Sequence, residues 1–262
     1  MGEKESMSDF TQEMKAKLAM DSLIDSCKIL ADLSGGVEHA NGYDAYFAPE
    51  TFWYHRVNLL GGGDRPVEEV VEEIAARVRK GELPPLLSWC GWEQNGRALR
   101  RKLTELGYVP VVEQIAMFKS LEDYTPWEGE SKVEIIAPEE VEGWSVKTAE
   151  FFPKPPEVTG LMMIADHEAC DFMSWKEDGE MLGGTLLICQ GDNAGIHEVS
   201  THPEHRGKGY GKALMHKAFT LATAKGCKYA TLQASPMGYP LYLSLGMEEV
   251  GSIQNWIMPP QD

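Results

Sequence analysis

The sequence predicts a protein of the α/β class with two domains. Segments rich in β-branched and aromatic residues alternate along the chain with segments whose apolar residues recur at helical spacing, and glycine or proline separates most of them. The chain has 262 residues, of which 43% are hydrophobic, so it can bury a sizeable core. That length favours roughly two domains.

In the first half, helical periodicity and its interruptions define most of the expected elements. Apolar residues from Phe10 to Leu30 recur at helical spacing, and Gly35-Gly36 ends this helix. Proline in the first turn and Gly81 after the last mark the next helix. We expect a helix over 9–33, a loop over 37–50 with a short strand at 43–47, a strand over 52–60, a helix over 66–80, a strand over 85–90, a helix over 94–106 and a strand over 108–118.

In the second half, the same reasoning predicts strands and helices around a hairpin turn at 177–180. The strands are expected over 133–136, 171–176, 181–190, 195–201 and 228–233, and the helices over 138–151, 157–166 and 208–225. Residues 122–132 contain a proline, a glycine and several acids. We therefore expect them to link an N-terminal domain over 1–121 to a C-terminal domain over 133–262.

Composition restricts the possible partners. The net charge of −17 argues against a nucleic-acid partner, because phosphate binding requires a basic surface. No apolar run reaches the length of a membrane span, so no membrane partner is expected. The five cysteines form no CxxC pair and the chain shows no secretory signal, which predicts reduced thiols and a cytoplasmic location.

The most informative segment is 199–212, which reads VSTHPEHRGKGYGK. Its three glycines can turn the backbone so that N–H groups point inward, and the helix that begins there adds unpaired N–H groups and a partial positive charge. This acidic protein also gathers Arg206, Lys208, Lys212 and Lys217 within twelve residues. The segment therefore predicts a cradle for a phosphate-type anion.

Spacing excludes two common nucleotide-binding motifs. In the P-loop pattern, Arg206 would stand in place of the first glycine and Ala213 in place of Ser or Thr. In the dinucleotide pattern, the third glycine would be Lys212 or Leu214, and no acid occurs between Glu204 and Glu248.

The pattern that does match is Arg206-x-x-Gly209-x-Gly211, which resembles the acyl-CoA diphosphate loop of the GCN5-related N-acetyltransferase (GNAT) family. Strand 195–201, helix 208–225, strand 228–233 and the segment 239–247 follow in the family's order, with Met247 in place of the family's phenylalanine. The likeness covers about residues 133–258. It implies a mixed, mostly antiparallel sheet flanked by helices, and acetyl-CoA as cofactor.

The resemblance also implies which residues bind that cofactor. Backbone groups of the bulged strand would contact the acyl end, and the glycine-rich loop would hold the diphosphate. The corresponding residues here are Val199, Ser200 and Thr201 for the acyl end and Arg206, Gly207, Lys208, Gly209, Tyr210, Gly211 and Lys212 for the diphosphate.

Catalytic candidates follow from position and from acid–base chemistry. Tyr242 occupies the position of the family's general acid, and a phenol can protonate a departing thiolate if it is held within hydrogen-bond distance; packing against the cofactor is the alternative role. Adjacent strand residues face opposite ways, so at most one of Glu198 and His197 is expected to face the cleft unless the bulge re-aims the other. The resemblance favours Glu198 as the base, because the family often places an acid on this strand, and His197 or a water path are the alternatives. Tyr239 is expected to be structural.

The pair His202 and His205 has the spacing of an H-x-x-H metal motif. Pro203 lies between them, and both belong to the loop that leads into the cradle. We therefore expect no metal, and surface roles for both, with His205 near the phosphate.

The order of elements in 52–118 repeats that of 195–258, so the first half resembles a degenerate GNAT domain; an unrelated α/β domain is the alternative. Its GGGDRP loop lacks the Arg-x-x-Gly-x-Gly pattern, and we expect no cofactor there.

The function implied is direct transfer of an acetyl group from coenzyme A to the primary amine of a small molecule or peptide. The alternatives are a non-catalytic acyl-CoA sensor or scaffold and, less favoured, a nucleotide-binding regulator. The acceptor and the oligomeric state, monomer or dimer, stay open.

Overall fold

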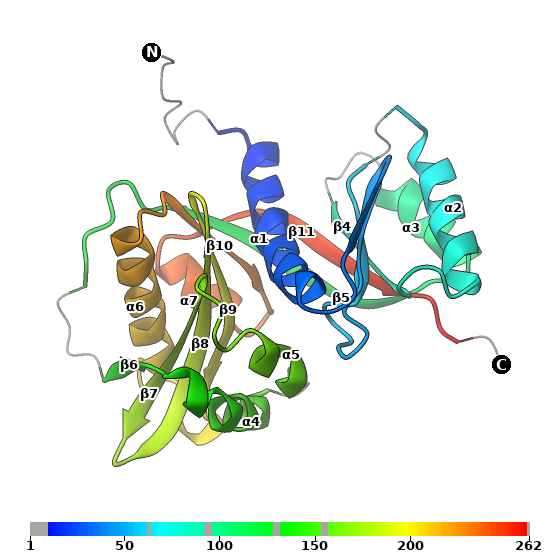
Figure 1. The fold of residues 1–262 in the computed structure, drawn as a ribbon. Coiled ribbons are helices and arrows are strands. Elements are labelled where there is room, and N and C mark those ends of the chain that lie inside the picture. The colour runs from blue at the N-terminus through cyan, green and yellow to red at the C-terminus, as the bar shows by residue number, and fades with distance from the viewer. Residues whose placement is uncertain (1–9, 62–63, 92–95, 128–131, 153–156, 261–262) are drawn as a thin grey trace. The chain divides into compact units, whose positions relative to one another are not determined.

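The computed structural model (Figure 1) describes the chain except for residues 1–9, 62–63, 92–95, 128–131, 153–156 and 261–262. It contains two compact units, and each is described by itself. The first comprises Met1–Leu23 and Ala116–Val250, and the second comprises Ile24–Ile115 and Gly251–Asp262. Three elements cross from one unit to the other: α1 (Gln12–Asp32), β5 (Val109–Ser120) and β11 (Glu248–Ile257).

The first unit is a sheet with helices on both faces. Its strand order is β11-β5-β10-β9-β8-β7-β6. The further strands are β6 (Val133–Ile135), β7 (Cys170–Glu177), β8 (Glu180–Gln190), β9 (Asn193–Thr201) and β10 (Tyr229–Ala234). The helices are α4 (Val141–Phe151), α5 (Val158–Met163), α6 (Tyr210–Ala224) and α7 (Tyr239–Ser244).

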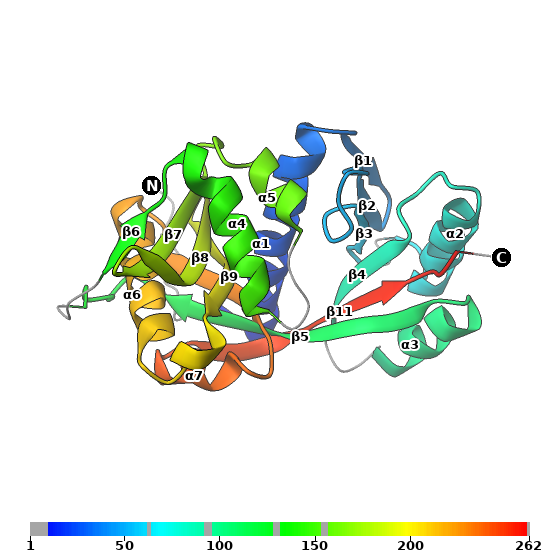
Figure 2. The same ribbon diagram turned by 90° about the horizontal axis from the view of Figure 1, so that it is seen from below.

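Two adjacent glycines of β8 show how closely these helices pack. A Cβ on Gly184 would lie 3.0 Å from the Thr148 hydroxyl of α4, whereas a Cβ on Gly183 would lie 3.0 Å from Leu214 of α6. Since successive residues of a strand face opposite ways, α4 and α6 cover opposite faces. Figure 2 shows this arrangement, with α4 and α5 on one side of the sheet and α6 and α7 on the other.

The first turns of α1 lie on the same face as α4. The Asn193 amide donates to the Leu18 carbonyl (3.1 Å), and the Gln233 amide donates to the Ala19 carbonyl (2.8 Å). These bonds hold the helix against β9 and β10. Nothing in the local sequence of α1 indicates this partner, because the contact joins residues more than 170 positions apart.

The second unit places two helices over one face of its sheet. The strand order is β1-β2-β3-β4-β11-β5. The elements not yet given are β1 (Val37–Ala40), β2 (Tyr43–Tyr46), β3 (Arg56–Leu59), β4 (Leu86–Gly91), α2 (Val67–Arg79) and α3 (Gly96–Glu105). Alternate strand residues such as Val57, Leu87 and Trp256 form one core with Ile74 of α2 and Leu103 of α3.

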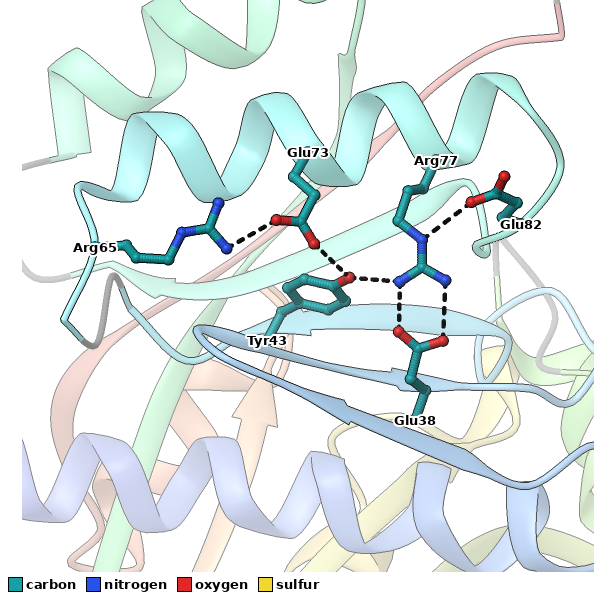
Figure 3. A network of polar contacts seen from close by, with 6 residues as sticks. All are labelled: Glu38, Tyr43, Arg65, Glu73, Arg77 and Glu82. Atoms are coloured by element: carbon teal, nitrogen blue, oxygen red, sulfur yellow. Dashed lines mark hydrogen bonds and ion pairs between the residues drawn. The ribbon is translucent and has the colours of Figure 1, made fainter.

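A network of charges ties β1 and β2 to α2 (Figure 3). The Arg77 guanidinium binds both oxygens of the Glu38 carboxylate, donates to the Tyr43 hydroxyl oxygen (2.7 Å) and pairs with Glu82 (3.2 Å). The hydrogen bond from Arg77 lowers the pKa of Glu38. The Tyr43 hydroxyl in turn donates to Glu73 (3.2 Å).

The same network includes Arg65, the positively charged residue of the GGGDRP loop. Arg65 pairs with Glu73 at 2.8 Å (Figure 3). Pro66, which caps α2, has no N–H group to offer to an anion. Residues 62–63 of this loop lie outside the described residues, and the expectation that the loop binds no cofactor stays a prediction.

Strand exchange distinguishes the two halves of the chain. β3, α2, β4, α3 and β5 follow one another as β9, α6, β10, α7 and β11 do, and in each half the first two strands pair in parallel. However, β4 pairs with residues 252–257 of β11, and β10 neighbours β5. Each half therefore gives its final strand to the other half's sheet.

This exchange explains why the compact units differ from the predicted domains 1–121 and 133–262. The last residues of β5 belong to the first unit, and the last residues of the chain belong to the second. Part of the predicted linker, 128–131, lies outside the described residues. The predicted fold class, a mixed and mostly antiparallel sheet flanked by helices, is confirmed.

Three elements differ from the sequence prediction, and one of them is the helix expected over 157–166, which is confined to Val158–Met163. Residues 37–40 form β1 instead of a loop, and they pair with β2 around an Asn41-Gly42 turn with Gly42 at φ 103°. An Asn-Gly pair is a strong hairpin signal that the prediction did not use. The strand expected over 52–60 is confined to Arg56–Leu59.

Candidate active site

A bulge in β9 shapes the centre of the candidate site. Leu186 of β8 pairs with His197, and Gly184 pairs with Ser200, so the register shifts between them. Glu198 lies in the bulge with φ at +53°, in the left-handed region that residues other than glycine rarely adopt. Such bulges re-aim side chains next to functional sites.

Glu198 and Tyr242 are brought together at this bulge. Burial raises the pKa of Glu198 to about 7. Burial also raises the pKa of Tyr242, and the Glu198 carboxylate raises it further. Tyr242 is only 7% exposed and lies on the first turn of α7. The two candidate catalytic side chains are therefore electrostatically coupled.

Gly238 leaves room for the Tyr242 ring. A Cβ at Gly238 would lie 2.8 Å from the ring carbon Cε2 and 3.1 Å from the hydroxyl oxygen. Sequence reasoning missed this residue. Its position four residues before Tyr242 was the available signal, because residues at that spacing stack on a helix.

His197 is directed elsewhere. Its Nε2 atom is buried without a hydrogen-bond partner among the described residues, and it occupies the space that a Cβ on Gly195 would need (2.7 Å). The same Cβ would lie 3.0 Å from Cβ of Ser22 in α1. Burial lowers the pKa of His197 to about 4, so the ring stays neutral near pH 7. These surroundings favour Glu198 as the base.

β9 and β10 separate beside the bulge. They pair at three positions, from Asn193 with Tyr229 to Gly195 with Thr231. Beyond this point the segment Val199–Thr201 has no partner in β10, and Ser200 and Thr201 pair with β8. The separation leaves the β10 side of this segment without a strand partner, as a cofactor arm between the two strands would require.

The glycine-rich loop has the conformation expected of an anion cradle. Gly207 and Gly209 adopt φ values of +78° and +91°, and α6 begins directly afterwards at Tyr210. Residues 206–209 are exposed. Among the described residues, the first amide of the helix start with a backbone partner is that of Ala213, which donates to Gly209 (3.0 Å). The preceding amides of the cradle are thus available to a ligand.

The basic residues of the loop are held in different ways. The Arg206 guanidinium donates to the Phe151 carbonyl (2.9 Å), at the end of α4. Lys208 lies 3.4 Å from Nδ1 of His205, and both Lys208 and Lys212 are exposed. The positive charge at the helix start therefore faces solvent.

His202 and His205 contact each other and the backbone of the loop. His202 accepts a hydrogen bond from the Glu204 amide (3.3 Å), and the two imidazole rings lie edge to face at 5.2 Å. Within the described part of the chain, no group of three or more His, Cys, Asp and Glu side chains could hold a metal ion. Tyr239, expected to be structural, donates its hydroxyl hydrogen to Glu249 (2.7 Å).

Comparison with known proteins identifies the segment that carries this site. Residues 133–247 match the family of acetyltransferases described as "Acetyltransferase (GNAT) family". This segment belongs to the GNAT family. Acetyl transfer from acetyl-CoA is the general reaction of that family. No curated protein matches the sequence significantly.

Solved structures share the fold over nearly the whole chain. A GCN5-related N-acetyltransferase from Kribbella flavida is 16% identical, with a TM-score of 0.66 over 94% of this chain and 95% of its own. One from Sphaerobacter thermophilus is 17% identical, with a TM-score of 0.60 over 95% of each chain. At these identities the likeness concerns the fold and not the substrate.

Proposed function

We propose that the protein is an acetyl-CoA-dependent N-acetyltransferase that acts on a primary amine by direct transfer. The observation that carries the proposal is the coupled pair Glu198 and Tyr242 at the point where β9 and β10 separate. The cradle at 206–212 leads into the first turn of α6, the helix that follows the same strand. The described surroundings thus fit both ends of coenzyme A.

Acetyl-CoA supplies an acetyl group activated as a thioester. The cradle amides, with Arg206, Lys208 and Lys212, bind its diphosphate. Backbone donors of Val199–Thr201 stabilise the oxyanion that develops on the acetyl carbonyl, and one such donor is worth about 3 kcal/mol.

Glu198 accepts the proton that the amine must lose. An alkyl ammonium group has a pKa of about 10.4, so a base is needed near neutral pH. A carboxylate with a pKa of about 7 is suited to this role, since it is largely ionised above neutrality and is more basic than an ordinary glutamate. Neutral His197 lies beside it but points into the space between Gly195 and α1.

Tyr242 donates a proton to the departing thiolate and recovers one from the attacking nitrogen as the amide forms, while Glu198 later releases its proton to solvent. Burial raises the pKa of Tyr242 and ionised Glu198 raises it further, so the phenol is a poor acid before reaction. Once Glu198 has taken the proton of the amine it is neutral, and this electrostatic penalty disappears. The coupling therefore makes the phenol more acidic at the stage when the thiolate leaves.

A test combines binding with turnover. We expect the protein to bind CoA in a calorimeter and to release free thiol from acetyl-CoA with at least one amine in a panel of polyamines, amino acids, aminoglycosides and peptides. CoA binding without thiol release for any amine would instead support the acyl-CoA sensor. Stabilisation by ATP and not by CoA would reject both.

In the part of the chain that the structure describes, no helix has the length and apolar character of a membrane span.

A further inference from the structure

Tyr210 stands at the centre of the cradle but directs its side chain away from it. It is the first residue of α6 and lies between Gly209 and Gly211. Residues 206–209 are exposed, whereas Tyr210 is only 8% exposed. Its backbone belongs to the anion site, and its ring packs into the body of the unit.

Two residues of β7 hold that ring. The indole of Trp175 stacks on it with centroids 4.6 Å apart and planes 17° from parallel. The Tyr210 hydroxyl donates to one oxygen of Glu177 (2.8 Å), and Lys132 binds the other oxygen (3.0 Å). Tyr210 is thus anchored by an aromatic stack and by a charge-assisted hydrogen bond.

Ring contacts continue along the other side of the loop. The ring of His205 lies 6.1 Å from that of Tyr210, the ring of His202 lies 5.2 Å from His205, and Phe151 lies 5.4 Å from His202. Side chains on both sides of the loop therefore connect it to α4 and β7.

The loop needs such anchors because its backbone restrains it weakly. Glycines lose more conformational freedom on ordering than other residues, and the loop has three in five positions. Near its two ends, the backbone bonds from Arg206 to Pro203 (3.5 Å) and from Ala213 to Gly209 (3.0 Å) restrain it. If the loop became ordered only when the ligand binds, the free-energy cost of that ordering would weaken the binding of the ligand.

We propose that Tyr210, held by Trp175 and Glu177, is a positioning residue that presets the amides of the cradle before the ligand binds. The identification of the ligand as the diphosphate of coenzyme A rests on the proposed function. A separate part of the proposal concerns the free protein. There the cradle is ordered without ligand, because the Tyr210 side chain holds it in place.

The test compares graded variants with a matched control. Tyr210→Phe removes the hydrogen bond and keeps the stack, Tyr210→Leu removes both, and Glu177→Gln keeps an acceptor without the charge. Tyr239→Phe removes a similar Tyr–Glu bond (2.7 Å to Glu249) outside the cradle. Hydrogen exchange in peptides that cover 206–212 is measured on the free protein, and the Kd for CoA is measured by calorimetry.

We expect faster exchange in this segment for the Tyr210 variants and an unchanged rate for Tyr239→Phe. The Kd for CoA should rise about ten-fold in Tyr210→Phe, the factor expected for loss of a hydrogen bond to a charged group. It should rise further in Tyr210→Leu and less in Glu177→Gln. The KM for acetyl-CoA should follow the Kd while kcat at saturation stays within about two-fold, because the reacting groups are untouched.

Two results would overturn the inference in different ways. Wild-type exchange and wild-type Kd in Tyr210→Phe and Tyr210→Leu would show that the loop needs no anchor, and would leave the proposed function intact. Faster exchange in the variants of a protein that does not bind CoA would instead reject the proposed function, and with it the cofactor role of Tyr210.

Discussion

At the scale of single residues, the backbone conformation and the burial of Glu198 give its carboxyl group an unusual pKa. The residue is an ordinary glutamate in the sequence, and adjacent His197 would be the usual choice of base near neutral pH. The positive φ of Glu198 in the bulge and its burial beside Tyr242 instead support the preference for Glu198 that the resemblance to the family implies. The pKa of the carboxyl rises to about 7, and that of the imidazole falls to about 4.

The base assignment predicts a pH profile. If Glu198 must be ionised, kcat/KM should rise as pH increases through about 7, the pKa of its carboxyl, and level off above it. Glu198→Gln should lose activity by about a hundred-fold or more and should lack this limb. Glu142→Gln, an exposed change on α4, is the control and should keep the wild-type profile. An unaltered limb in Glu198→Gln would assign the proton path to water.

The acid assignment predicts a separation of binding from turnover. Tyr242→Phe keeps the packing of the ring against Gly238 but removes the proton donor. We expect kcat to fall about a hundred-fold, in the range typical of a general acid, while the Kd for CoA changes less than about two-fold. Equal losses in both quantities would make the phenol a binding contact instead.

At the scale of elements, the strand–loop–helix unit from β9 to α6 combines the bulge and the cradle. Both ends of the proposed cofactor site therefore lie on one continuous segment, Glu198 to Lys212. Gly209, with φ at +91°, caps α6, and Gly211 approaches α7 so closely that a Cβ would lie 3.1 Å from Leu241. The two glycines are thus required for different reasons.

Gly209 also provides a test with an internal control. Gly209→Val forces a β-branched residue into the left-handed region and narrows access to the amides. Gly226→Val introduces the same strain at the other end of α6, where φ is +88° and a Cβ would also meet open space. Both variants should lose stability, measured by urea unfolding, but only Gly209→Val should weaken CoA binding more than about ten-fold. Equal affinities in the two variants would remove the cradle from the site.

At the scale of the whole molecule, the exchange of final strands makes the C-terminus part of the second unit. Asn255 of β11 accepts a hydrogen bond from the Ser88 hydroxyl (2.8 Å) and donates to the Val112 carbonyl (3.2 Å). Buried Arg56 adds a hydrogen bond to the same Asn255 oxygen (3.3 Å). This strand therefore supplies polar contacts as well as the buried Trp256 to a sheet whose other strands lie before residue 121.

Truncation after Val250 should therefore destabilise the second unit. The deletion removes the pairing partner of β4 and leaves buried polar groups without hydrogen bonds, each at a cost of about 1–3 kcal/mol. We expect fast hydrogen exchange in peptides from 37–115. Truncation after Pro259 keeps β11 and should retain wild-type protection. Wild-type protection after the shorter truncation would contradict the role assigned to this strand.

Several elements and the candidate site residues could be predicted from the spacing of residues that lie close together in the sequence. The periodicity of α2 and α6, the Arg206-x-x-Gly209-x-Gly211 pattern and the position of Tyr242 depend on residues close together in the chain, so the pattern is visible without the fold. The tertiary structure decided the rest: the exchange of β5 and β11, the contact of α1 with β9 and β10, and the opposite pKa shifts of Glu198 and His197. Each of these depends on a partner that is distant in the sequence or on burial by other elements, and neither spacing nor composition encodes them.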